Sequence, residues 1–139
     1  MVLFGLVLPV VLLMVGVAID GSRLFQEHLA IQTLADEAAG AGAQQVDVGG
    51  SSAVRADAPA ELILGRGRDS AFVVADTYLA ERAGDRWTSW SIEVEPRAIT
   101  VTVQRQVELV FMPIAGLRQQ IVEARSVAAP LSGIAEPTR

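Results

Sequence analysis

The side chains best suited to acid–base or metal chemistry in this chain surround its single histidine, His28. Glu27 precedes it, and Gln32 follows four residues later. On a helix His28 and Gln32 share a face, whereas Glu27 lies about 100° around the axis from His28. A metal site needs several convergent ligands, and a nucleophile triad needs its imidazole in a pocket. The pattern therefore predicts a solvated helix face rather than either site.

Phosphate-binding and carboxylate chemistry have no better support. Gly65 and Gly67 are not followed by the third glycine or the lysine of phosphate-binding loops, and no strand pattern precedes them. Acidic pairs such as Asp36 and Glu37 alternate with polar groups, as is typical of solvent-exposed faces. We therefore predict no catalytic residue, cofactor, metal or small-molecule substrate, and we do not expect an enzyme.

The composition excludes further classes of function. The chain has 139 residues, a net charge of −5 and no cysteine, so disulfides and thiolate metal sites do not stabilise it. Its basic residues are scattered singly along the chain. Nucleic-acid binding needs a basic patch or stripe, so we do not expect it.

The segment that would anchor the rest of the chain is the apolar run Met1–Ile19. It contains no charged side chain and is followed directly by Asp20 and then Arg23. A helix of this length measures about 28 Å, close to a hydrocarbon core of about 30 Å. A cleavable signal peptide ending near Ala18 and a buried helix of a soluble core are the alternatives. Pro9 would kink a soluble helix, but membrane helices tolerate proline. We therefore predict a single membrane span over 1–19.

A helical pattern continues to about Gln45, so we expect one long helix that becomes amphipathic beyond the membrane. Its apolar positions are Leu24, Ile31, Leu34 and Ala38. A ridge of small residues spaced four apart follows its second half: Ala35, Ala39 and Ala43. Small residues allow another surface to approach closely. This ridge either packs on the protein's own sheet or faces a partner helix.

A second helix is predicted after a loop. Asp47–Ala58 has the composition of a loop, and a short helical turn starts near Pro59. Gly65–Arg68 breaks the chain again. An amphipathic helix then covers Ser70–Ala83 after a cap at Asp69. We expect its apolar face to comprise Phe72, Ala75 and Leu79.

The last third of the chain changes to a period of two, which is typical of strands. A first strand is centred on Trp90–Val94, and Glu95–Ala98 forms a turn. A second run covers Ile99–Phe111, either as one long strand or as two pieces broken near Arg105. The third strand is Gln119–Ala129.

The apolar connection Met112–Leu117 separates the last two strands. It either tucks under the sheet or offers Met112 and Ile114 to a partner. In the second case the chain would be a membrane-anchored, extracytoplasmic protein-binding module.

These elements predict an α+β fold in which a long N-terminal membrane-spanning helix continues into an amphipathic helix, packed on a small three-stranded antiparallel sheet. The predicted parts are a transmembrane helix over 1–19, its helical continuation over 20–45, an extracytoplasmic α/β domain over 46–129 and a loose tail over 130–139. The charges flanking the span favour neither orientation, but so short an N-terminus would not translocate as a domain. We expect it inside and the domain outside.

Two segments carry a resemblance to a known family. They are Leu6–Leu24, with its Leu8-Pro9 and its closing Asp20 and Arg23, and Leu34–Ala43, with its Ala35-Asp36-Glu37-Ala38-Ala39. They resemble the TadE/TadG family of pilin-like proteins from tight-adherence (Flp-type, type IVc) pilus systems. The strands Ile99–Val103 and Val122–Ala129 add weaker support, as does the apolar connection between them.

The resemblance implies a pilin-like, single-pass protein of the bacterial inner membrane that assists assembly or initiation of an adhesive pilus or a related secretion machine. Its partners would be other pilin-like subunits, in a hetero-oligomer, and the pilus assembly platform. It would act by packing its N-terminal helix against other such helices, either beneath the filament or within it. The implied span and packing residues are Leu6, Pro9, Leu13, Gly16, Asp20 and Arg23. The candidate partner-facing residues are Ala35, Ala39, Ala43, Met112 and Ile114.

Pro9 would loosen the helix locally, and Asp20 and Arg23 would mark the membrane interface. Processed members of the family carry a basic leader and a Glu at the fifth mature position, which Met1–Gly5 lacks. This chain would be either an unprocessed member or one whose true start lies upstream.

Overall fold

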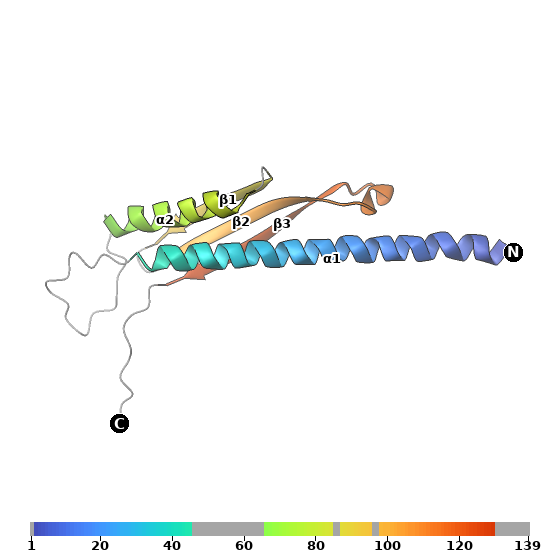
Figure 1. The fold of residues 1–139 in the computed structure, drawn as a ribbon, viewed down its shortest axis with the longest axis horizontal. Coiled ribbons are helices and arrows are strands. Elements are labelled where there is room, and N and C mark those ends of the chain that lie inside the picture. The colour runs from blue at the N-terminus through green and yellow to red at the C-terminus, as the bar shows by residue number, and fades with distance from the viewer. Residues whose placement is uncertain (1, 46–65, 85–86, 96–97, 130–139) are drawn as a thin grey trace, which may run out of the picture.

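A computed structural model of the protein describes residues 2–45, 66–84, 87–95 and 98–129 (Figure 1). The loop predicted over 47–58, the turn near Pro59 and the tail over 130–139 lie outside these residues.

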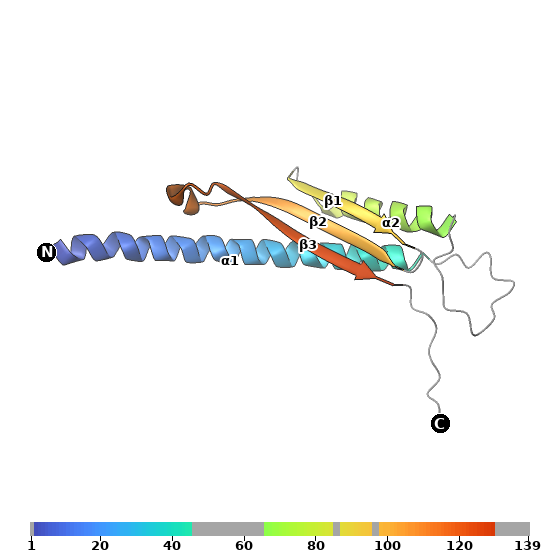
Figure 2. The ribbon, with the colours of Figure 1, turned by 180° about the vertical axis from the view of Figure 1, so that it is seen from behind.

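The first helix, α1, runs without interruption from Val2 to Ala43, a length of about 63 Å at 1.5 Å per residue. It continues through Pro9, although this residue has no N–H to donate to the carbonyl of Gly5. Figures 1 and 2 show that its N-terminal part extends beyond the sheet, while its C-terminal part lies along the sheet. The prediction of one long helix is confirmed.

The second helix, α2, spans Arg66–Arg82 and begins before its predicted start. Asp69 therefore lies in the first helical turn rather than at the cap, and the break predicted at Gly65–Arg68 does not interrupt the helix from Arg66 onwards. Phe72 is also misplaced by the prediction, because it is exposed while Ala71, Ala75 and Leu79 are buried. Two helices can approach closely only through small side chains, so alanine rather than phenylalanine occupies the contact with α1.

Three antiparallel strands form one sheet in the order β1-β2-β3. They are β1 (Thr88–Val94), β2 (Ile99–Glu108) and β3 (Gln119–Ala128). Trp90 pairs with Val103, and Val103 pairs with Ala124 across the next strand. Of the two predicted alternatives, the second strand is therefore one unbroken piece through Arg105.

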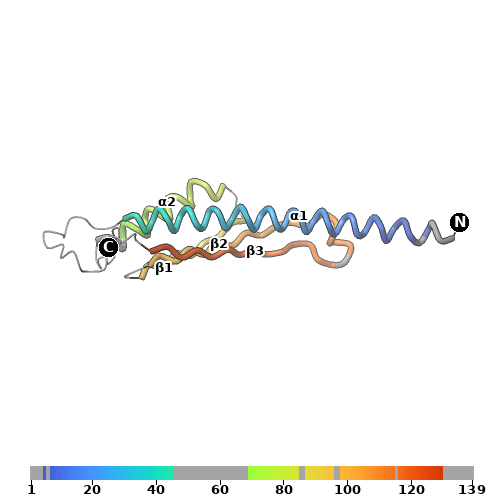
Figure 3. The backbone as a smooth tube through the Cα atoms, turned by 90° about the horizontal axis from the view of Figure 1, so that it is seen from below, coloured from blue at the N-terminus to red at the C-terminus, as the bar shows by residue number. Residues whose placement is uncertain are grey.

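Both helices cover the same face of the sheet, as the view from below shows (Figure 3). α1 lies against β2 and β3, and α2 lies against α1 and β1. The core between the layers combines small helix residues with β-branched strand residues. Its fully buried members include Ile31, Ala35, Ala38, Ala39, Ala71, Ala75, Leu79, Ile99, Val101 and Val103. The α+β fold is confirmed.

Candidate functional site

The N-terminal part of α1 presents an apolar surface that the rest of the chain leaves uncovered. The helix carries a window with a mean hydropathy of 1.8, only 11% of which is buried, and is long and apolar enough to cross a membrane. A helix of a soluble core would be mostly buried instead. Pro9 and Leu13 are exposed, and the side chain of Leu6 lies outside the described set.

Asp20 is the first charged residue after the apolar run, and its carboxylate is fully buried. Oδ1 accepts a hydrogen bond from the backbone N–H of Val110 at 3.0 Å, and Oδ2 accepts from Phe111 and Met112, each at 2.8 Å. Asp20, which we expected to mark the membrane interface, therefore binds the β2–β3 connection to α1. Arg23, one turn further on, is exposed.

Gly16 is the other position on α1 where the β2–β3 connection comes close. A Cβ atom built there would lie 2.8 Å from Cβ and Cγ of Phe111, well inside van der Waals contact. Gly16 is accordingly buried, while its neighbours Val15 and Val17 are exposed. Glycine at this point lets the aromatic ring rest on the helix backbone.

The β2–β3 connection ends in a short 3₁₀ helix, η1 (Met112–Ala115), closed by Gly116. Gly116 has a φ of 87°, a left-handed conformation that favours glycine. Met112 is half-buried, and Ile114 is 79% exposed. The connection predicted either to tuck under the sheet or to face a partner lies beside α1, at the end of the sheet nearer the helix N-terminus (Figures 1 and 2).

The acidic neighbour of His28 has a structural partner. Glu27 accepts a hydrogen bond from Nη1 of Arg105 at 2.9 Å, and Nε of Arg105 donates to Oγ1 of Thr88, also at 2.9 Å. These contacts hold the one charged side chain on the core-facing side of β2. His28 is exposed on α1, and among the described residues no three His, Cys, Asp or Glu side chains gather as a metal site would need.

The small-residue ridge faces the protein's own core. Ala35 and Ala39 are fully buried, and Ala43 is 4% exposed. Of the two alternatives for this ridge, the structure shows packing within the chain, so these residues offer a partner no surface.

The opposite side of α1 carries two large apolar side chains that the sequence analysis did not select. Phe25 is 63% exposed and Leu29 is 50% exposed, and they lie one helical turn apart on the face turned away from the sheet. Their spacing of four residues, out of phase with the buried positions, is the signal that could have identified them. They continue the exposed apolar surface of α1 beyond Asp20.

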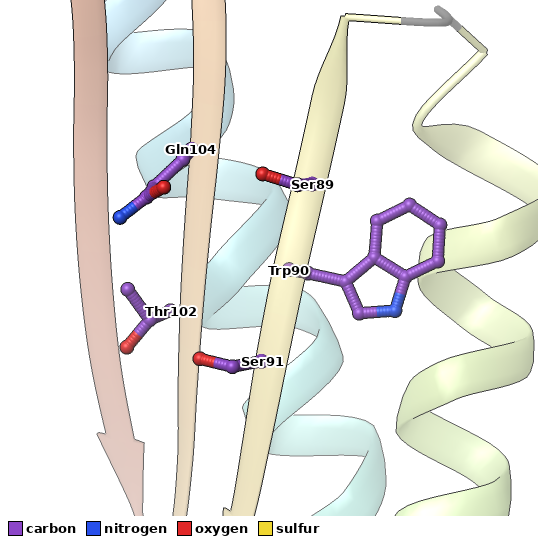
Figure 4. A pocket seen from close by; sticks show the side chains of 5 residues that line it. All are labelled: Ser89, Trp90, Ser91, Thr102 and Gln104. Atoms are coloured by element: carbon purple, nitrogen blue, oxygen red, sulfur yellow. The ribbon is translucent and has the colours of Figure 1, made fainter.

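A shallow depression on the outer face of the sheet has a volume of about 120 Å³. Figure 4 shows its lining: Ser89, Trp90, Ser91, Thr102 and Gln104. The indole of Trp90 turns towards α2, where its Nε1 donates to Asp76 at 2.9 Å. The hydroxyls and the amide that remain include no acid or base, so the depression has no evident catalytic group.

A polar cluster joins the two helices at the edge of the core, against which Tyr78 packs. The hydroxyl of Tyr78 donates to Oε2 of Glu37 at 2.7 Å, and the Arg82 guanidinium lies 4.5 Å from the centre of the Tyr78 ring. The hydrogen bond to Glu37 raises the pKa of Tyr78, and burial adds to the increase, while Arg82 opposes it. This cluster links α1 to α2.

Comparison with known families decides what kind of protein carries this geometry. Residues 28–128, well over half of the chain, match the family described as "Putative Tad-like Flp pilus-assembly", and residues 1–45 match "Putative Flp pilus-assembly TadE/G-like". The chain belongs to the TadE/G-like Flp pilus-assembly family. No curated protein and no solved structure matches it. As a TadE/G-like chain with a helix suited to a bilayer, it is a membrane protein related to pilus assembly.

Proposed function

We propose that this chain is a minor pilin-like subunit, anchored in the bacterial inner membrane by α1, that assists assembly or initiation of a tight-adherence pilus or a related secretion machine. One observation carries the proposal. The apolar surface of α1 does not stop at the membrane boundary, because Phe25 and Leu29 extend it along a helix whose other face is already buried. Lipid would cover the first part, and we assign the second part to a contact with another subunit.

The subunit would act by helix–helix packing and would need no active site. The single pass would place the N-terminus in the cytoplasm and the α/β domain outside. The face of α1 that carries Phe25 and Leu29 would meet the N-terminal helices of other pilin-like subunits. The sheet and α2 would hold the opposite face rigid, because Ile31 and the alanine ridge of α1 are buried against them.

A clean deletion tests the assembly role. We expect loss of surface pili and of adherence, measured by counting pili in electron micrographs and by surface attachment, with restoration by the full-length chain. Normal pilus numbers in the deletion strain would contradict the proposal.

Complementation with two double variants tests the packing face. Phe25→Ser with Leu29→Ser should fail to restore pili, because subunits lose their apolar contact. The control, Phe72→Ser with Val73→Ser, removes two exposed apolar side chains from α2 and should restore them. Equal restoration by the two variants, at equal protein levels, would show that this face of α1 is not the contact.

A further inference from the structure

The part of the molecule that the packing of α1 does not explain is the segment 110–117, which we name the membrane-proximal turn. It contains no charged residue, and Glu108 and Arg118 are the nearest charges on either side. Four of its apolar side chains are exposed: Val110, Phe111, Ile114 and Leu117. An exposed group of this kind normally marks a contact surface.

The height of this turn along α1 indicates which surface it meets. Phe111 rests on Gly16, three residues before the end of the uncharged run at Ile19. At 1.5 Å per residue this contact lies about 5 Å inside the apolar segment. Elements that lie in a membrane interface typically bury their apolar face by about 5–10 Å. If α1 spans the bilayer, the turn must therefore be at the level of the lipid.

The backbone of the turn is suited to a medium without water. In apolar surroundings each N–H must find a partner within the protein. Internal acceptors are present for Leu109, Val110, Phe111, Met112, Ile114, Gly116 and Leu117. Pro113 has no N–H to satisfy.

Asp20 accepts three of these hydrogen bonds. They also account for the presence of a carboxylate at a position where burial would otherwise be unfavourable. A carboxylate at the edge of a bilayer loses its hydration unless donors replace the water. Here three backbone N–H groups replace it, and the same bonds satisfy three N–H groups of the turn. The turn therefore lowers the free-energy cost of placing the Asp20 carboxylate near lipid, and Asp20 lowers the cost of placing the N–H groups of the turn there.

We propose that the membrane-proximal turn inserts into the leaflet on the domain's side, with Ile114 and its apolar neighbours between the lipid headgroups and the upper acyl chains. Two adjacent parts of the molecule, the span and the turn, would then be inserted in the membrane. This fixes the angle at which the domain stands on the bilayer. The inference rests on the membrane span and not on the role in pilus assembly.

Site-specific labelling of the full-length chain in lipid nanodiscs tests the insertion. The chain has no native cysteine, so Ile114→Cys can carry a single environment-sensitive fluorophore. Val127→Cys is the matched control, because Val127 is also a strongly exposed apolar residue, at the far end of β3 (79% and 61% exposed, respectively). The bilayer contains phosphatidylcholine with or without a nitroxide near the headgroup end of its acyl chain.

We expect the nitroxide lipid to reduce the fluorescence at position 114 by about twofold or more and to leave position 127 nearly unchanged, because only the first label lies within the interface. Equal, water-like emission at both positions would overturn the proposal. A label at 114 that is shielded from water but insensitive to the nitroxide would also overturn it, since a protein would then cover the turn. The nanodisc contains no pilus component, so neither result depends on the proposed assembly role.

Discussion

At the scale of single residues, the carboxylate of Asp20 holds the β2–β3 connection against α1. It joins two parts of the chain that are 90 residues or more apart through three backbone hydrogen bonds. Hydrogen bonds to a charged acceptor are stronger than neutral ones, and their loss leaves buried donors unpaired. The position of the turn should therefore depend on this one side chain.

Replacing Asp20 tests this dependence. In Asp20→Ala we expect the amides of Val110, Phe111 and Met112 to exchange with solvent faster by roughly tenfold or more, measured by hydrogen exchange on the detergent-solubilised chain. The control Asp36→Ala removes an exposed carboxylate of the same helix that bonds Gln32 and should leave these amides unchanged. Unaltered protection in Asp20→Ala would show that the carboxylate does not hold the turn.

An asparagine at position 20 distinguishes the roles of the two carboxylate oxygens. Asp20→Asn keeps one oxygen, which can still accept from Phe111 and Met112, but turns an amide group towards the N–H of Val110. We expect Val110 to lose more protection than the other two amides in the same exchange experiment. Equal loss at all three would contradict the geometry assigned to the two carboxylate oxygens.

The titration of the Tyr78 hydroxyl measures the contact between α1 and α2, because Tyr78 on α2 donates to Glu37 on α1. It is the only tyrosine in the chain, so its phenolate absorbance can be followed directly. Because its pKa is raised in the folded state, its contribution to stability is complete below the ordinary pKa of about 10 and declines as the pH rises through the folded value.

Glu37→Gln removes the largest cause of this increase and should shift the titration towards lower pH. The expected result is a lower midpoint in the variant than in the parent chain. Identical titration curves would contradict the hydrogen bond between Tyr78 and Glu37.

At the scale of elements, α1 and the membrane-proximal turn fit together only because Gly16 has no side chain. Gly16→Ala places a methyl group within 3 Å of the Phe111 side chain, whereas Gly21→Ala places one where no atom lies within 4 Å. Both changes bring the same gain in helix propensity. Relative to Gly21→Ala, we expect Gly16→Ala to lower the free energy of unfolding by about 1–3 kcal/mol through overpacking.

Thermal or denaturant unfolding of both variants in the same detergent provides the measurement. Equal stability of the two would mean that the ring of Phe111 does not rest on the helix at Gly16.

The elements themselves were largely predictable from local patterns. The uncharged run followed by helical spacing predicts α1, and alternation with a period of two predicts the three strands. Contacts between distant segments were not predictable in this way. Arg105, the polar residue that left the continuity of β2 open, is paired with Glu27, 78 residues away, and no local pattern indicates that ion pair. The start of α2 and the exposure of Phe72 were missed because tertiary packing against α1 selects which face is buried.

The site was less predictable than the fold. The family resemblance pointed to the N-terminal helix, but spacing alone left open whether the alanine ridge served the core or a partner. The structure buries Ala35 and Ala39, and the unpartnered face with Phe25 and Leu29 became evident only once the buried face was known. The buried role of Asp20 had no sequence signal, because its three donors are backbone groups.

At the scale of the whole molecule, one long helix carries two surfaces with different partners. The sheet and α2 cover one face beyond the membrane, and the other face carries exposed apolar side chains along the span and, beyond it, at Phe25 and Leu29. In a bilayer lipid would cover the first part of this face, and the proposed function assigns Phe25 and Leu29 to a contact with another pilin-like subunit. The membrane-proximal turn would set the tilt at which this second surface is presented to the assembling pilus.

The most direct test of this account is site-specific photo-crosslinking of the full-length chain in cells that make pili, with the photoreactive residue at Leu29 or at Val73. Val73 is a matched, exposed position on α2 (58% against 50% for Leu29). Mass spectrometry of the adducts should identify pilin-like subunits at Leu29 and none at Val73. Adducts at Leu29 that contain no pilin-like subunit, or equal capture from both positions, would contradict packing through α1.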